Sequence, residues 1–267
     1  MNRKIKSLLA IAAFTAAAFT AQAQIAVPDL FAGFKSTTDS LNLEINLGTA
    51  SSLVSNAQSN GGTYLIGNFN SQLTSIFGAD WNSASLGAAG TNWGVSGAQT
   101  TELQDTVWAS RQWGTAAGTL GVKNSTSWAA LGGATLNTTS VNVQKVYAGI
   151  NSIGTAMGGN AYSVATSSGN SYSSTTTNPN AFATWANSTF QNNMSRVNAS
   201  VGGVASDLYY MAPSTVGEYL GTFLLTSNGD FSFNVAAIPE PSTYAALLGV
   251  ATLGFAALRR RKQALVA

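Results

Sequence analysis

The chain of 267 residues contains neither cysteine nor histidine. Without cysteine it can form no disulfide and has no thiol nucleophile, so its stability must come from apolar burial and backbone hydrogen bonds. Without histidine the His-dependent catalytic triads are excluded, and the two absences together remove the usual zinc and copper ligands. A calcium loop needs several acids in a short run, and the chain has none. We therefore predict no metal and no cofactor.

Charge is also scarce, because only 8% of the residues are Asp, Glu, Lys or Arg, against about a quarter in ordinary soluble domains. Three of the twelve cations lie in the first six residues and four at positions 259–262. Between residues 24 and 238 this leaves five cations against nine acids, a net charge of −4. Phosphate binding requires clustered Lys and Arg, so we predict that nucleic acid is not a partner. Ser, Thr, Asn and Gly dominate instead, as in a neutral exported β protein.

The N-terminal segment has the three parts of a secretory signal peptide. Cations among the first six residues precede the apolar run Leu8 to Phe19, and Ala21-Gln22-Ala23 has the small-x-small form of a cleavage site. We predict that the secretion machinery exports the chain and that signal peptidase cuts between Ala23 and Gln24. The alternative is an uncleaved anchor, which the short apolar run disfavours.

The C-terminal segment joins a proline motif to an apolar helix and a basic end. Because proline fixes φ and restricts the residue before it, Pro239 and Pro241 hold Glu240 extended, the shape that a protease cleft binds. Ser242 to Leu258 carries no charge and would form a helix about 26 Å long, near the lower limit for a bilayer span. Alanine, glycine and threonine dilute its apolar residues, so it is a marginal anchor. The cations that follow should stay cytoplasmic, and they are Arg259, Arg260, Arg261 and Lys262.

This segment resembles the PEP-CTERM sorting signal of Gram-negative bacteria, in which Pro-Glu-Pro precedes an apolar helix and an Arg-rich end. The resemblance implies recognition by exosortase, a membrane-embedded cysteine protease, and removal of the helix. The chain would pass transiently through the inner membrane and reach the cell surface or the exterior. Proteins with this signal are usually linked to extracellular polysaccharide and biofilm material. A plain C-terminal anchor is the alternative.

The predicted domains are a signal peptide (1–23), an exported mainly β domain (24–237), the sorting signal (238–262) and a tail (263–267). For the exported domain we expect a β-sandwich with two or three short helices, flanked by the signal helix and a C-terminal transmembrane helix. Leu41 to Leu47 alternates strictly between apolar and polar residues, which predicts a half-buried strand. Asn228-Gly229 predicts a type I′ hairpin turn between Tyr219–Leu225, with its odd-numbered residues on one face, and Phe231–Val235.

Other segments give weaker signals. Helical spacing of apolar residues predicts helices over Phe69–Phe77 and Val143–Ile153. The remaining predictions are a short entry segment at Val27–Lys35, loops at Ser55–Gly62 and Ser167–Pro179, short strands within Ala79–Thr101, and strands at Thr63–Ile66, Thr106–Ser110 and Thr119–Val122.

Two kinds of functional residue can be considered in the middle of the chain. Glu102 and Asp105 could be the acid pair of a glycoside hydrolase, but two acids in a solvated segment is the simpler interpretation. Trp93 and Trp113 each precede a glycine and are candidates for stacking on sugar rings, although large aromatics more often belong to the core. Two classes therefore remain: a non-enzymatic exported surface or matrix protein sorted by exosortase, or a secreted protein that binds or cleaves polysaccharide.

Overall fold

The computed structural model describes residues 25–79, 81, 84–91, 105–114, 116–177 and 190–236. The predicted signal peptide, the sorting signal with its helix, Trp93 and Glu102 lie outside these residues. Inside them, no helix has both the length and the apolar character needed to cross a bilayer.

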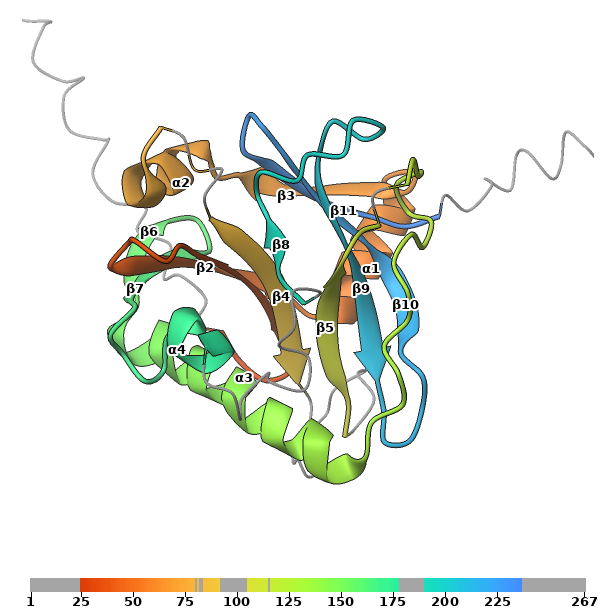
Figure 1. Ribbon diagram of the computed structural model, residues 1–267, viewed down its shortest axis with the longest axis horizontal. Coiled ribbons are helices and arrows are strands. Elements are labelled where there is room, and N and C mark those ends of the chain that lie inside the picture. Colours follow the sequence, from red (N-terminus) through yellow and green to blue (C-terminus); the bar gives the residue numbers. More distant parts are fainter. Residues whose placement is uncertain are drawn as a thin grey trace, which may run out of the picture.

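The described part of the chain is mainly β, as predicted. Its strands are β1 (Leu30–Lys35), β2 (Leu41–Gly48), β3 (Thr63–Asn68), β4 (Ser85–Thr91), β5 (Val107–Gln112), β6 (Thr155–Gly158), β7 (Ala161–Ala165), β8 (Asn192–Asn193), β9 (Gly203–Met211), β10 (Glu218–Thr226) and β11 (Asp230–Asn234). Its helices are α1 (Ala50–Ser59), α2 (Asn70–Phe77), α3 (Gly133–Ile153) and α4 (Tyr172–Thr177). The strands form a single sheet in the order β3-β11-β10-β9-β5-β4-β1-β2-β7-β6, with β8 paired to β4 (Figure 1).

This sheet curls until strands of its two halves face each other. The rings of Phe34 on β1 and Phe231 on β11 lie 6.2 Å apart, although four strands separate β1 from β11 in the sheet. Bulges bend a sheet, and register shifts interrupt the pairings β1–β2, β9–β10, β3–β11 and β6–β7. The expected sandwich of two sheets is therefore replaced by a half-barrel made from one.

Apolar side chains fill the inner face of the half-barrel. Phe223 stacks on Phe231 with ring centroids 5.4 Å apart and lies 5.0 Å from Phe233. Helices α1 and α2 close this interior with the buried side chains of Leu53 and Leu73. Burial of one such side chain contributes about 1.5–3 kcal/mol, so this cluster supplies much of the stability of the fold.

Helix α1 replaces the loop predicted at Ser55–Gly62. Thr49 caps its first turn, because its hydroxyl oxygen accepts a hydrogen bond of 3.1 Å from the N–H of Ser52. Leu53 and Ala57 lie four residues apart and both face the core. The many serines and asparagines favour a loop locally, but burial of the Leu53 side of the helix overrides that preference.

The two helices predicted from apolar spacing are confirmed. The one expected over Phe69–Phe77 is α2, which ends at Gly78. The one expected over Val143–Ile153 is α3, which begins earlier, at Gly133, and is 21 residues long, so it is not short. Helix α3 lies against the outer face of the sheet and buries Val143 and Tyr147 there (Figure 1).

The exposed loop predicted at Ser167–Pro179 contains α4 and one of the most deeply buried side chains, Tyr172. The tyrosine ring covers Gly33 of β1, and its hydroxyl reaches Gly87 of β4; a Cβ atom at either glycine would overlap with it. Because the two glycines are cross-strand partners, they form one hollow for the ring. The prediction failed because the residues that form this hollow are distant in sequence.

The prediction of a short entry segment at Val27–Lys35 is wrong, because Leu30–Lys35 forms strand β1. It lies between β2 and β4, inside the sheet rather than before it. Phe31 and Phe34 are both fully buried and belong to the outer and inner clusters respectively.

Strand β2 is confirmed, but it is buried on both sides rather than one. Leu43 and Ile45 face the inner cluster, whereas Asn42 and Glu44 face outward and are equally inaccessible, at 0% exposure. Helix α4 contacts this side, and the carboxylate oxygen Oε1 of Glu44 accepts a hydrogen bond of 2.8 Å from the N–H of Tyr172. Burial raises the pKa of Glu44 to about 8.

The predicted C-terminal hairpin is confirmed, with Phe223 of β10 opposite Phe233 of β11. Its turn is different, because type I′ needs positive φ at both central residues and in Asn228-Gly229 the glycine alone has it, at 81°. Strand β10 ends at Thr226 and β11 begins at Asp230, so the loop is longer than two residues, and within it the N–H of Gly229 donates to the carbonyl of Thr226 at 3.0 Å. A register shift in β10 also turns Tyr219 to the outer face, so it does not share the inner face as predicted.

We expect Glu44→Gln to stabilise the protein at alkaline pH and to flatten its pH dependence. The folded-state pKa of about 8 exceeds the ordinary 4.5, so in this interval the folded chain holds a proton that the unfolded chain has lost. The stability of the wild type is therefore complete below this window and falls across it, by at most about 5 kcal/mol. Thermal unfolding at about pH 5 and about pH 8, followed by circular dichroism, measures the difference.

Asp39→Asn is the matched control, since Asp39 lies in the partly exposed turn between β1 and β2. It should leave the pH profile of the wild type unchanged. Parallel profiles for the wild type and Glu44→Gln would contradict the assignment.

Candidate functional site

A long connection from Trp113 to Trp128 crosses the outer face of β9 and β10 and is held there by a buried carboxylate. Asp207, on β9, is 0% exposed. Its Oδ1 accepts hydrogen bonds from the indole N–H of Trp113 at 2.7 Å and from the hydroxyl of Thr222 at 2.8 Å. Its Oδ2 accepts from the N–H of Asn124, at 2.8 Å, and from both the N–H and the hydroxyl of Ser125, at 2.7 and 2.9 Å.

Neighbouring side chains complete this cluster. The Tyr209 hydroxyl lies 2.8 Å from that of Ser125, and burial raises the pKa of Tyr209 to about 12. Arg111, the cross-strand partner of Asp207, donates to the carbonyl of Ser127 at 2.9 Å and lies 4.5 Å from the ring centre of Trp128. Five donors surround the Asp207 carboxylate, which thereby fastens the connection to β9.

The strand predicted at Thr119–Val122 is a turn in this connection. The N–H of Val122 donates to the carbonyl of Thr119 at 3.1 Å, and Gly121 has a φ of 77°. Gly121 packs so closely on the backbone of Val235 that a Cβ atom would overlap with it. The positive φ of Gly121 is incompatible with a strand conformation, so the predicted strand cannot form there.

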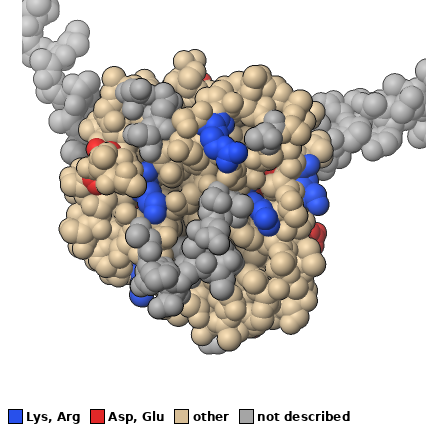
Figure 2. All heavy atoms as spheres, viewed as in Figure 1, with Lys and Arg blue, Asp and Glu red and all other residues tan. Residues whose placement is uncertain are grey.

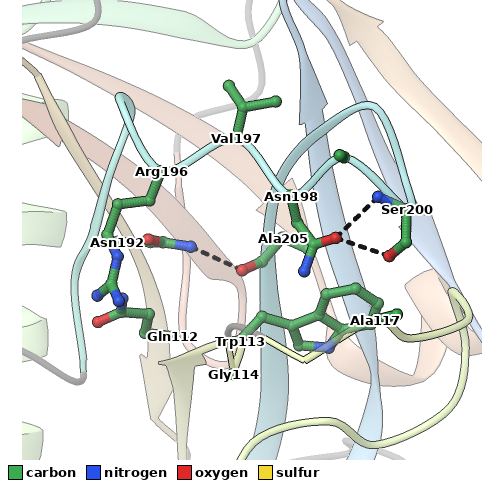
Figure 3. A pocket seen from close by; sticks show the side chains of 11 residues that line it. Gln112, Trp113, Gly114, Ala117, Asn192, Arg196, Val197, Asn198, Ser200 and Ala205 are labelled. Carbon is green, nitrogen blue, oxygen red and sulfur yellow. Dashed lines mark hydrogen bonds between the residues drawn. The ribbon is translucent and has the colours of Figure 1, made fainter.

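Beside this cluster the surface opens into a pocket of about 350 Å³. Trp113 and Gly114 line one side and the segment after β8 lines the other (Figure 3). Figure 3 shows Gln112, Asn192 and Arg196 gathered at one end, and Asn198 and Ser200 at the other. The complete lining is Gln112, Trp113, Gly114, Ala117, Asn192, Arg196, Val197, Asn198, Ala199, Ser200 and Ala205.

Side-chain hydrogen bonds fix the wall formed by Asn198 and Ser200. The Oδ1 of Asn198 accepts from the N–H of Ser200 at 3.0 Å and from its hydroxyl at 2.6 Å. The amide of Asn198 reaches the carbonyl of Ala116, and the hydroxyl of Ser200 that of Gly118, each at 3.3 Å. The wall is therefore tied to the opposite connection, and the pocket is preformed.

At the other end of the pocket, two polar side chains have groups without a hydrogen-bond partner among the described residues. The side-chain N–H₂ of Asn192 donates to the carbonyl of Ala205 at 2.7 Å, but its Oδ1 has no partner although the residue is only 2% exposed. The exposed guanidinium of Arg196 forms no ion pair or hydrogen bond with the described residues. No acidic residue lines the pocket.

The structure places Trp113, a predicted sugar-stacking residue, in the pocket but buries it to 5% exposure with its N–H turned to Asp207. Trp81, Trp108 and Trp128 are likewise buried. Whether Trp113 contacts a sugar stays a prediction, as it does for Trp93, which lies outside the described residues.

The acid pair of Glu102 and Asp105 stays a prediction, because Glu102 lies outside the described residues. Asp105 is exposed in a turn with a φ of 52°. The described ranges contain no group of three acids that could hold a metal. Figure 2 shows one face, on which separate Lys and Arg side chains and smaller patches of Asp and Glu lie among mostly uncharged residues.

Sequence reasoning did not select Asp207, Asn192 or Arg196. A single acid inside the apolar segment Gly203–Met211 was the one available signal for Asp207. Asn192 and Arg196 lie in polar sequence that resembles the rest of the chain, so only their position in the pocket of the folded protein marks them as candidates.

Comparison with known proteins identifies the C-terminal segment. Residues 237–262 match the family model of the PEP-CTERM protein-sorting motif. The chain therefore carries this sorting motif, as predicted, and the motif implies processing by exosortase and export to the cell envelope or surface. No curated protein and no solved structure matches the chain.

We expect Asp207→Asn to release the connection between Trp113 and Trp128. An asparagine has one acceptor oxygen, so its N–H₂ group would face N–H and O–H donors, and the loss should be about 3 kcal/mol. Thermal unfolding measures the loss, and faster amide hydrogen exchange at Asn124 and Ser125 locates it. Asp230→Asn is the control, because its oxygen can still accept the 2.8 Å hydrogen bond from Asn68. Equal melting temperatures for the two variants would refute the role of Asp207.

Proposed function

We propose that this chain is a non-enzymatic surface or matrix protein of a Gram-negative bacterium, exported across the inner membrane and released there by exosortase. Signal peptidase would first remove residues 1–23. Cleavage near Pro239-Glu240-Pro241 would then remove the helix and the basic end. The observation that carries this proposal is the PEP-CTERM match at residues 237–262.

The end of the folded domain supports this order of events. Val235 is buried in the inner cluster, and its N–H donates to the carbonyl of Gly62 at 2.8 Å. Glu240 lies five positions after Val235, a distance of at most about 18 Å when the chain is extended. With a membrane-anchored helix after Pro241, the folded domain would be held close to the outer side of the inner membrane until cleavage.

The non-enzymatic role rests on what the described acids do. Glu44 lies beneath α4 and Asp207 is surrounded by five donors, so both hold structure together. The chain also lacks the histidine and cysteine on which most hydrolytic centres depend.

We expect Glu240→Ala to leave full-length protein in the inner membrane, because the protease loses the side chain between the two prolines. Cell fractionation followed by intact-mass measurement tests this, and exported wild-type protein should lack residues 243–267. Glu218→Ala is the control, since Glu218 is an exposed acid on β10 outside the motif. If surface protein retains the last two dozen or so residues, the segment is a plain anchor and the proposal fails.

A second candidate function, polysaccharide binding, is favoured by the pocket that Trp113 lines. We expect Trp93→Ala and Trp113→Phe to weaken retention on immobilised polysaccharide, because each removes indole surface from a sugar-stacking position. Phenylalanine is preferred at Trp113 because it preserves more of the packing, and a melting curve must show that the variant is folded. Unchanged retention would count against stacking, while a reducing-sugar assay of Glu102→Gln separately tests cleavage.

A further inference from the structure

We propose that the pocket between Trp113 and the segment after β8 binds a sugar unit that carries a carboxylate, with Arg196 as the residue that pairs with the charge. The proposal deepens the polysaccharide-binding candidate and rests on it. It concerns the described residues alone and does not depend on how the C-terminal motif is processed.

The charge of the pocket selects an anion. Arg196 is the one charged residue in its lining, and its guanidinium has no partner among the described residues. A guanidinium presents a planar fork of donors that matches a carboxylate, and the side chain of Gln112 stands beside it (Figure 3). One cation with no acid in the lining suits a sugar unit with one negative charge.

The rest of the pocket suits hydroxyl groups and the apolar face of a ring. Asn192 lines the inner wall, and the Oδ1 of its buried amide has no partner, while Asn198 and Ser200 place polar groups at the opposite end. Trp113 and Val197 add apolar surface, and the indole N–H is already used by Asp207. Carbohydrate sites combine these features, because sugars have polar edges and apolar faces.

Size and charge exclude the main competing ligands. A pocket of about 350 Å³ lies at the small end of the range for small-molecule sites, so one or two sugar units would fill it. A single guanidinium is too little positive charge for a nucleoside polyphosphate. Nucleic acid needs several cations along a groove, and the lining supplies one.

The test is calorimetric titration of the full-length chain in mild detergent at low ionic strength with trigalacturonate. Maltotriose is the uncharged comparison, and acetate and inorganic phosphate are the anions without sugar. Three variants each make the net charge one unit more negative: Arg196→Gln and Gln112→Glu in the pocket, and Lys145→Gln on α3, which does not line it. Because the change in charge is matched, a general electrostatic effect would appear equally in all three.

We expect trigalacturonate to bind the wild type at least about tenfold more tightly than maltotriose, acetate or phosphate do. Arg196→Gln and Gln112→Glu should each weaken it about tenfold or more, and Lys145→Gln should bind like the wild type. Arg196→Lys should recover part of the affinity, because it restores the charge without the fork. Equal binding by Arg196→Gln and the wild type, or equal weakening by Lys145→Gln, would overturn the site. Acetate or phosphate binding as tightly as trigalacturonate would overturn the sugar assignment.

These measurements use purified protein, whereas sorting is measured in cells. Normal release of Glu240→Ala in cells, together with trigalacturonate binding by the purified wild type, would refute the sorting proposal alone. Retention of Glu240→Ala in the inner membrane, together with no trigalacturonate binding by the purified wild type, would refute the binding site alone.

Discussion

The fold depends on contact between aromatic rings that belong to opposite halves of one sheet. Phe34 and Phe231 meet across an interior that four intervening strands enclose, and Phe223 and Phe233 pack around them. A chain with no cysteine can form no disulfide, and its few charged residues leave little scope for ion-pair networks. Closure of the sheet on its own apolar face is the source of stability that this composition leaves available.

Two buried carboxylates then fasten elements to the outer face, in different ways. Asp207 accepts hydrogen bonds from five donors and binds the Trp113–Trp128 connection to β9. Glu44 accepts one described hydrogen bond beneath α4, and its raised pKa means that the carboxyl group is largely neutral near pH 7. The two acids thus hold elements to the same face with different numbers of hydrogen bonds.

The Asp207 clamp also creates the pocket. The hydrogen bond from Trp113 to Asp207 holds the indole against β9, where the indole forms an apolar part of the pocket lining. Hydrogen bonds between Asn198 and Ser200 fix another part of the lining. The pocket needs no movement to form, which favours binding of a small polar ligand. Delivery is encoded separately, in the PEP-CTERM motif that begins two residues after the buried Val235. One segment therefore directs the chain to its compartment, and the folded domain determines what it can contact there.

Patterns with a short range in sequence were predicted correctly from the chain alone. The sorting motif, strand β2, helices α2 and α3 and the β10–β11 hairpin each depend on residue order within about 25 positions. The tertiary structure decided the rest: the single curled sheet, the internal position of β1, the helix at α1 and the burial of Tyr172 over Gly33 and Gly87. Each of these depends on a partner far away in sequence. In a chain so rich in Ser, Asn and Gly, local composition predicts a loop even where contact with a distant part of the chain produces a buried helix or strand. Asn192 and Arg196 likewise could not be selected from the sequence, because their role depends on the pocket that both line.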